Sequence, residues 1–108
     1  MMDIERRVVR AVKKREQWAE KMNALAAQHC TNANASENPV DIGSSCSWLE
    51  VAYWFRDHYP VTRDQFEVYV SALERRMGLM PNDDAKNVVL AAITYAEKLF
   101  IDQEDFLK

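Results

Sequence analysis

The chain has 108 residues, of which 48% are apolar and 29% are charged, and its net charge at neutral pH is −3. This size and balance are those of one globular domain, and two glycines and three prolines are too few for the frequent turns of a sheet-rich fold. We therefore expect an all-α protein that forms a single domain over residues 1–108.

The opening stretch MMDIERRVVRAVKKREQW has no continuous apolar run, so we expect neither a signal peptide nor a membrane span, and no membrane partner. We accordingly expect a cytoplasmic protein with reduced cysteines. Charge is divided unevenly: residues 1–30 carry seven Lys/Arg against four acids (+3), and residues 31–108 carry seven against thirteen (−6). This asymmetry fits a basic segment that binds nucleic acid, and it equally fits a basic helix that pairs with acidic protein surface.

A single long helix is predicted over residues 2–29, because its seam positions alternate at spacings of four and three residues, as in a heptad repeat. These positions are Ile4, Val8, Ala11, Arg15, Trp18, Met22, Leu25 and His29. Arg15 and His29 are the polar members, and a polar seam residue can fix register or partner number at some cost in stability. Alternatively, both residues lie near the edge of the stripe and reach water by their length.

The stretch CTNANASENPVDIGSSC separates the two cysteines, and we expect residues 30–46 to form a flexible crossover loop. Three alternatives exist for this region. They are a disulfide between Cys30 and Cys46, a zinc site that adds His29 and His58, and a nucleophilic cysteine activated by one of these histidines. The chain has no CxxC or HxxxH pair, so we predict no metal and no cofactor.

Three shorter helices follow the polar stretch. Ser47 with Glu50, and Thr62 with Gln65, have the spacing of capping boxes and mark the starts of two of them, and Pro60 stops the helix between these boxes. The predicted helices cover about 48–59, 63–77 and 84–101, and residues 102–108 add a short helical turn or fray. Together with the first helix, these segments predict a four-helix, bundle-like architecture.

No catalytic motif stands out. The sequence has no GxGxxG, P-loop, HExxH, GxSxG or EF-hand pattern, and two glycines are too few for a phosphate-binding loop. The adjacent Asp83 and Asp84 are at the expected start of a helix. We therefore expect a protein that is not an enzyme and has no catalytic residues.

The length of the first helix favours protein binding. Its 28 residues span about 42 Å, whereas the other predicted helices have roughly 12, 15 and 17 residues. Unless the shorter helices stack end to end along it, several of its apolar turns stay uncovered, and another chain would cover them. We therefore predict a regulatory, adaptor or inhibitor protein that forms a homodimer through the heptad face of this helix.

The second predicted helix adds two aromatic residues to the predicted interface. Tyr53 and Trp54 point away from the stripe of Trp48, Phe55 and Tyr59, and exposed Tyr and Trp are typical interface anchors. Alternatively, the chain itself covers this helix on several sides. The predicted interface residues are Ile4, Val8, Ala11, Arg15, Trp18, Met22, Tyr53 and Trp54.

Nucleic-acid binding is the alternative function. The cations that would neutralise phosphates crowd the front half of the first helix, and they are Arg6, Arg7, Arg10, Lys13 and Lys14. The isoelectric point near 5.4 opposes this interpretation. A helix-turn-helix aligned on Gly78 fails, because Glu74 would occupy a position where a small residue must pack.

Overall fold

The computed structural model describes residues 2–108, with side chains from Asp3 onward. The described residues form four helices and no strand, which confirms the predicted all-α class and four-helix architecture. The helices are α1 (Met2–Ala35), α2 (Pro39–Asp57), α3 (Arg63–Gly78) and α4 (Asp83–Leu107). None of the four combines the length and the apolar character that a membrane span needs.

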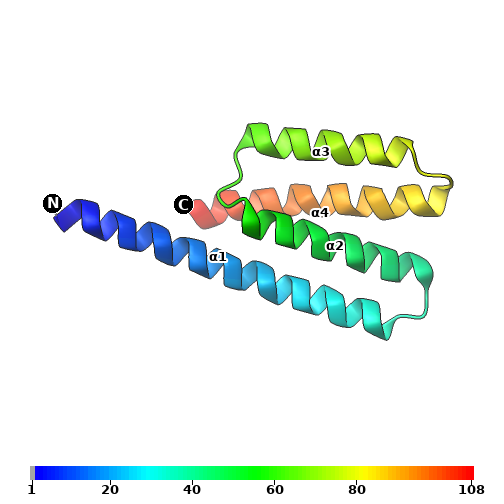
Figure 1. Ribbon diagram of the computed structural model, residues 1–108, viewed down its shortest axis with the longest axis horizontal. Coiled ribbons are helices and arrows are strands. Elements are labelled where there is room, and N and C mark those ends of the chain that lie inside the picture. The colour runs from blue at the N-terminus through cyan, green and yellow to red at the C-terminus, as the bar shows by residue number, and fades with distance from the viewer. Residues whose placement is uncertain (1) are drawn as a thin grey trace.

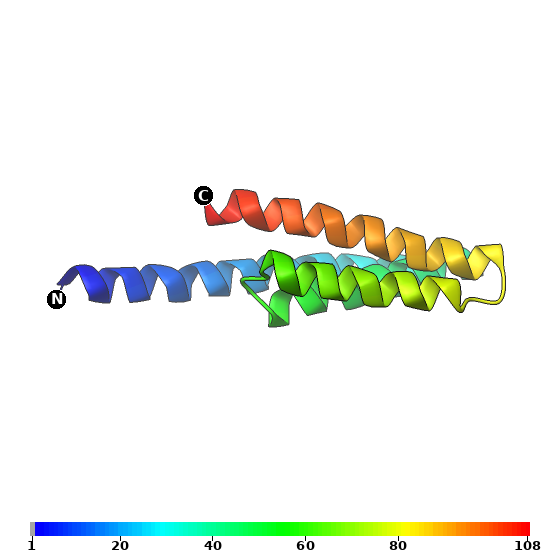
Figure 2. The ribbon, with the colours of Figure 1, turned by 90° about the horizontal axis from the view of Figure 1, so that it is seen from above.

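The helices form a flat, elongated array with extents of 58 × 31 × 17 Å. α1 and α2 make an antiparallel hairpin, α2 packs against α4, and α4 packs against α3 (Figure 1). Seen from above, α4 lies on one side of the other three helices (Figure 2). The front of α1 projects well beyond the ends of its neighbours in both views. The array therefore leaves one end of its longest helix without a companion.

The main core lies where α1, α2 and α4 meet. Trp18 and Met22 from α1, Phe55 from α2 and Leu99 from α4 are fully or almost fully buried there. Burying a large apolar side chain contributes roughly 1.5–3 kcal/mol. A smaller cluster joins α3 to α4, and it consists of Leu73, Val89 and Ile93. No described side chain before Trp18 belongs to either cluster, so both cores leave residues 3–17 of α1 without core contacts.

The segment predicted as a flexible loop, residues 30–46, is helical for most of its length. α1 continues through Ala35 and α2 begins at Pro39, so the connector has three residues. Asn38 caps α2, because its Oδ1 accepts a hydrogen bond from the Val40 amide at 2.9 Å. Pro39 occupies the first helical position, where a missing amide proton costs nothing.

Close helix packing explains why the loop prediction was wrong. Gly43 lies against α4, and a Cβ atom added there would come within 3.3 Å of the Val88 side chain. Ser45 is buried. Small residues that favour turns in isolation thus allow close packing of α2 here. The predicted capping box of Ser47 and Glu50 is also wrong, because α2 begins earlier and both residues lie inside it.

The capping box that begins α3 is confirmed. Thr62 Oγ1 accepts from the Gln65 amide at 3.2 Å, and the Gln65 side chain accepts from the Thr62 amide at 3.1 Å. These two bonds satisfy helix amides that would otherwise be unpaired. The chain therefore turns between α2 and α3 where the sequence indicates.

The C-terminal tail is a continuous part of α4, which extends to Leu107 rather than ending near residue 101. Gln103 is 1% exposed. Its Oε1 accepts from the Val61 amide at 2.8 Å, and its Nε2 donates to the Val61 carbonyl at 2.9 Å. This two-bond clamp ties the last turns of α4 to the turn between α2 and α3. Of the two alternatives predicted for the tail, the structure thus has the helical one, as a continuation of α4, and not the frayed one.

Candidate protein-binding surface

The front of α1, residues 3–13, stands clear of the other helices, and we call this segment the arm. Every residue of the arm is exposed, and its length is about 16 Å. Its large apolar side chains keep 50 to 63% of their surface accessible to water, and they are Ile4, Val8, Val9 and Val12. A contiguous apolar surface of this kind is typical of a binding site.

α1 enters the body of the protein at Trp18. The indole nitrogen of Trp18 donates to the Phe55 carbonyl at 3.1 Å, and its ring lies 5.8 Å from that of Tyr59 and 5.3 Å from that of Phe106. Trp18 and Met22 have no exposed surface. The prediction that these two residues contact a partner is therefore wrong, and they instead anchor the arm to the core.

The base of the arm borders an open groove of about 460 Å³. The residues that line it are Val8, Ala11, Val12, Lys14 and Arg15 from α1, with Tyr59, Pro60 and Leu107 from the body. Leu107 is 45% exposed, so the apolar surface continues from the arm onto the end of α4. The predicted interface residues Ala11 and Arg15 are also exposed. Four of the eight predicted interface residues thus share one accessible helix seam, and they are Ile4, Val8, Ala11 and Arg15.

The two aromatic residues predicted as joint anchors have different environments. Tyr53 is 38% exposed, and the Arg56 guanidinium lies 4.4 Å from its ring centre. Trp54 is half-buried between α2 and α3, where it stacks on Tyr69 with a centroid distance of 4.0 Å and an interplanar angle of 4°. It also lies 4.6 Å from the ring of His58. Trp54 therefore joins two helices of its own chain, and a part of its surface stays accessible.

Most of the cations predicted to bind phosphate are exposed on the arm, and these are Arg6, Arg7, Arg10 and Lys13. None of the ion pairs in the described part of the chain involves them. Lys14 differs, because its Nζ donates to the Phe106 carbonyl at 3.1 Å and lies 5.6 Å from the Phe106 ring centre. The basic surface is thus the arm itself, with Lys14 bound at its base.

His29, Trp48 and Tyr95 form an aromatic cluster that the sequence did not reveal. His29 is buried, and its Nε2 and the Tyr95 hydroxyl share a hydrogen bond of 2.7 Å. Its Nδ1 is buried without a partner among the described residues. Burial, and then the charge of Lys98, lower the pKa of His29, whereas burial, and then the charge of Asp102, raise the pKa of Tyr95 to about 12. His29 is thus a neutral core residue where α1 meets α2 and α4, and its predicted place on the seam of the first helix is confirmed.

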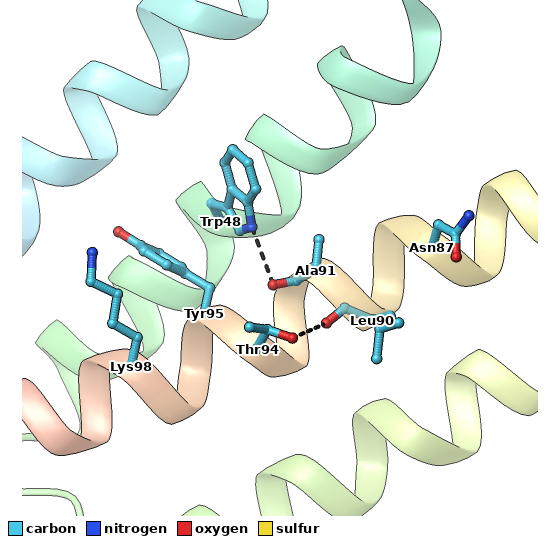
Figure 3. A pocket seen from close by; sticks show the side chains of 7 residues that line it. All are labelled: Trp48, Asn87, Leu90, Ala91, Thr94, Tyr95 and Lys98. Atoms are coloured by element: carbon cyan, nitrogen blue, oxygen red, sulfur yellow. Dashed lines mark hydrogen bonds between the residues drawn. The ribbon is translucent and has the colours of Figure 1, made fainter.

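Beside this cluster, an open groove of about 450 Å³ is lined mainly by apolar groups (Figure 3). The Trp48 indole nitrogen donates to the Ala91 carbonyl at 3.2 Å, which leaves one wall of the groove aromatic. Asn87 and Lys98 lie at opposite ends of the groove in Figure 3. Asn87 and Lys98 therefore do not converge on one point, as the groups of a catalytic site do.

Cys30 and Cys46 are both free and exposed. Asn34 Nδ2 lies 3.8 Å from the Cys30 sulfur, and this is a weak contact within α1. Among the described residues, no three His, Cys, Asp or Glu side chains come together in a metal-binding arrangement.

No protein-family model matches the chain, and neither a curated protein nor a solved structure matches it.

Proposed function

We propose that this is a cytoplasmic, non-enzymatic protein that acts by binding protein, with the arm of α1 as its contact segment and a second copy of the chain as its partner. The observation that carries this proposal is the exposed apolar seam of the arm on a helix whose later turns are anchored by Trp18. A helix of about 11 residues is marginal by itself in water. A partner that covers the seam would therefore stabilise both the arm and the contact.

The exposed apolar area sets the strength of the contact. Full burial of an aliphatic side chain contributes roughly 1.5–3 kcal/mol, and the three large apolar residues on the seam side of the arm, Ile4, Val8 and Val12, are about half-exposed. Covering one arm would then contribute about 2–5 kcal/mol, and a symmetric dimer makes the contact twice, before the cost of association. We therefore propose a weak dimer whose formation depends on concentration, which suits a regulatory, adaptor or inhibitor role.

Substitution of the seam tests this function. Val8→Asp with Val12→Asp places two charges where the apolar contact is proposed, and the matched control is Leu79→Asp, at a position 82% exposed between α3 and α4. Light scattering over a range of concentrations should give a dimer for the wild type and the control, and a monomer for the arm variant. A wild-type protein that stays monomeric at the highest concentration contradicts the proposal.

Nucleic-acid binding is the second candidate, favoured by the exposed cations of the arm. If it is correct, a labelled duplex should bind with an affinity that falls steeply with salt. Replacement of Arg10 and Lys13 with Glu should then abolish binding of the duplex. Binding that is absent at low salt excludes this candidate and leaves the protein-binding proposal intact.

A further inference from the structure

A second apolar groove lies between α2 and α3, and it has a volume of about 480 Å³. Its residues are Trp54 from α2 and Asp64, Gln65, Val68, Tyr69 and Ala72 from α3. Val68 is 71% exposed, which makes it the most exposed large apolar side chain within a helix of the described chain. The stacked rings of Trp54 and Tyr69 form the apolar bridge between the two helices.

The groove faces away from α4. α3 directs Phe66 toward α4, where the ring stacks on Phe100 at 4.4 Å. Val68 follows two residues later, about 200° further around the helix, so it lies on the opposite side of α3. α4 covers the layer of α1, α2 and α3 from one side only (Figure 2). The Val68 wall of the groove is therefore on the side of α3 that faces away from Phe100 of α4.

Charge complementarity indicates which helix fits this position. The arm and its base, residues 3–15, contain six Lys/Arg and two acids, which gives +4. Since the whole chain carries −3, the remainder carries −7. Asp64 lines the groove, and Glu50 on α2 is close enough to act on the Tyr69 hydroxyl. Arg76 also acts on that hydroxyl, and Glu67 and Arg75 line the adjoining surface beside Asp64 and Val68, so the border of the groove carries three acids and two cations.

Tyr69 supplies a neutral wall for an apolar helix. Burial, and then the charge of Glu50, raise its pKa to about 12, so that it stays an uncharged phenol. The groove thus combines an aromatic floor with an acidic border. The arm combines an apolar seam with basic neighbours, and the two surfaces are complementary in both respects.

Pairing of two arms is less favourable for a reason visible in the heptad. Arg7, Lys14 and Lys21 occupy the same flank of the seam at seven-residue spacing. In an antiparallel pair, this flank faces its own copy, which brings Arg7 of one chain toward Lys14 of the other. In a parallel pair, the flank of Arg7 and Lys14 faces the opposite flank of the other chain, which carries Glu5 and Val12. Arg7 of one chain then lies beside Val12 of the other and forms no ion pair. The arm therefore requires a different surface on the second copy.

We propose that the arm of one copy binds the Trp54–Tyr69 groove between α2 and α3 of a second copy. This inference rests on the proposed self-association and names its receptor surface. Two copies that exchange arms make the contact twice, which doubles the buried surface and closes the assembly. Val68 and the stacked rings meet the apolar seam, and the acidic border meets the cations of the arm.

Charge exchange tests the pairing by sedimentation velocity. The groove variant carries Asp64→Lys and Val68→Lys, and the arm variant carries Arg10→Glu and Lys13→Glu. The matched control carries Asp84→Lys and Leu79→Lys. Like the groove variant, it replaces an acid in the first turn of a helix and an exposed aliphatic residue with lysine, but both positions lie outside the groove. We expect each of the two variants to dimerise at least ten-fold more weakly than the wild type, and the control to dimerise normally. An equimolar mixture of the two variants should recover a mixed dimer, because each arm then meets a groove of opposite charge.

The two proposals fail in different ways. If the groove variant dimerises as strongly as the wild type, the receptor surface is wrong and self-association through the arm stands. If the wild type is monomeric at every concentration, the proposed function itself is wrong. If both variants weaken the dimer and their mixture stays monomeric, charge pairing between arm and groove is excluded.

Discussion

Replacement of Gln103 with Leu should destabilise the protein more than its position near the C-terminus suggests. The Gln103 side chain makes two hydrogen bonds to the backbone amide and carbonyl of Val61, a residue that is 4% exposed. A buried polar group without a partner costs about 1–3 kcal/mol, so the two groups together cost about 2–6 kcal/mol. The buried Leu offsets about 1.5–3 kcal/mol of this, which leaves a net loss of about 0.5–3 kcal/mol.

This loss is measurable by urea unfolding followed by circular dichroism. A domain of 108 residues has a stability of roughly 5–15 kcal/mol, and the change corresponds to a fall in Tm of roughly 2–24 °C. Gln28→Leu is the matched control, since Gln28 is an exposed residue of α1 and its replacement should change stability by less than about 0.5 kcal/mol. If Gln103→Leu behaves like this control, the last turns of α4 do not depend on the clamp, and the reasoning is refuted.

Four further predictions follow from the same contacts. The lowered pKa of His29 means that its contribution to stability is complete above pH 6.5 and declines as the pH falls below that value. Between pH 7.5 and pH 5.5, the free energy of unfolding in urea should therefore fall less for His29→Gln than for the wild type. An equal fall in both proteins would contradict the assignment. Cys30→Ser with Cys46→Ser should change the unfolding free energy by less than about 0.5 kcal/mol, because both thiols are exposed, and a loss of folding would contradict the free-thiol assignment. Trp54→Ala should cost about 1–3 kcal/mol in thermal unfolding, because the stack on Tyr69 is lost, and an unchanged Tm would show that the stack does not join α2 to α3. Trp18→Ala should cost about 3–5 kcal/mol, and a smaller effect than that of Trp54→Ala would show that the arm is not anchored at Trp18.

Periodicity predicted the helices, because it reflects which side of a helix is buried. The seam of the first helix and the capping box of Thr62 and Gln65 both have the positions that the sequence indicates. Local composition failed between the two cysteines, where Asn and Ser favour turns by themselves. Packing decided that region, since Gly43 allows α2 to approach Val88 closely.

The candidate surface was predicted in part for a similar reason. A heptad pattern identifies one face of a helix, but it does not show how far along that face the neighbouring helices extend. Ile4 and Val8 are exposed, whereas Trp18 and Met22 on the same seam are fully buried by α2 and α4. The groove of Trp54 and Tyr69 depends on which helices become neighbours in space, and the order of the residues carries no signal for that.

Hydrogen exchange of the arm amides, measured by mass spectrometry at low and high protein concentration, tests the central claim most directly. The account predicts that the amides of residues 3–13 exchange rapidly in dilute solution and become protected at high concentration, while the amides around Trp18 are protected in both. Arm amides that exchange equally fast at every concentration would contradict it, because no second copy would then cover the seam.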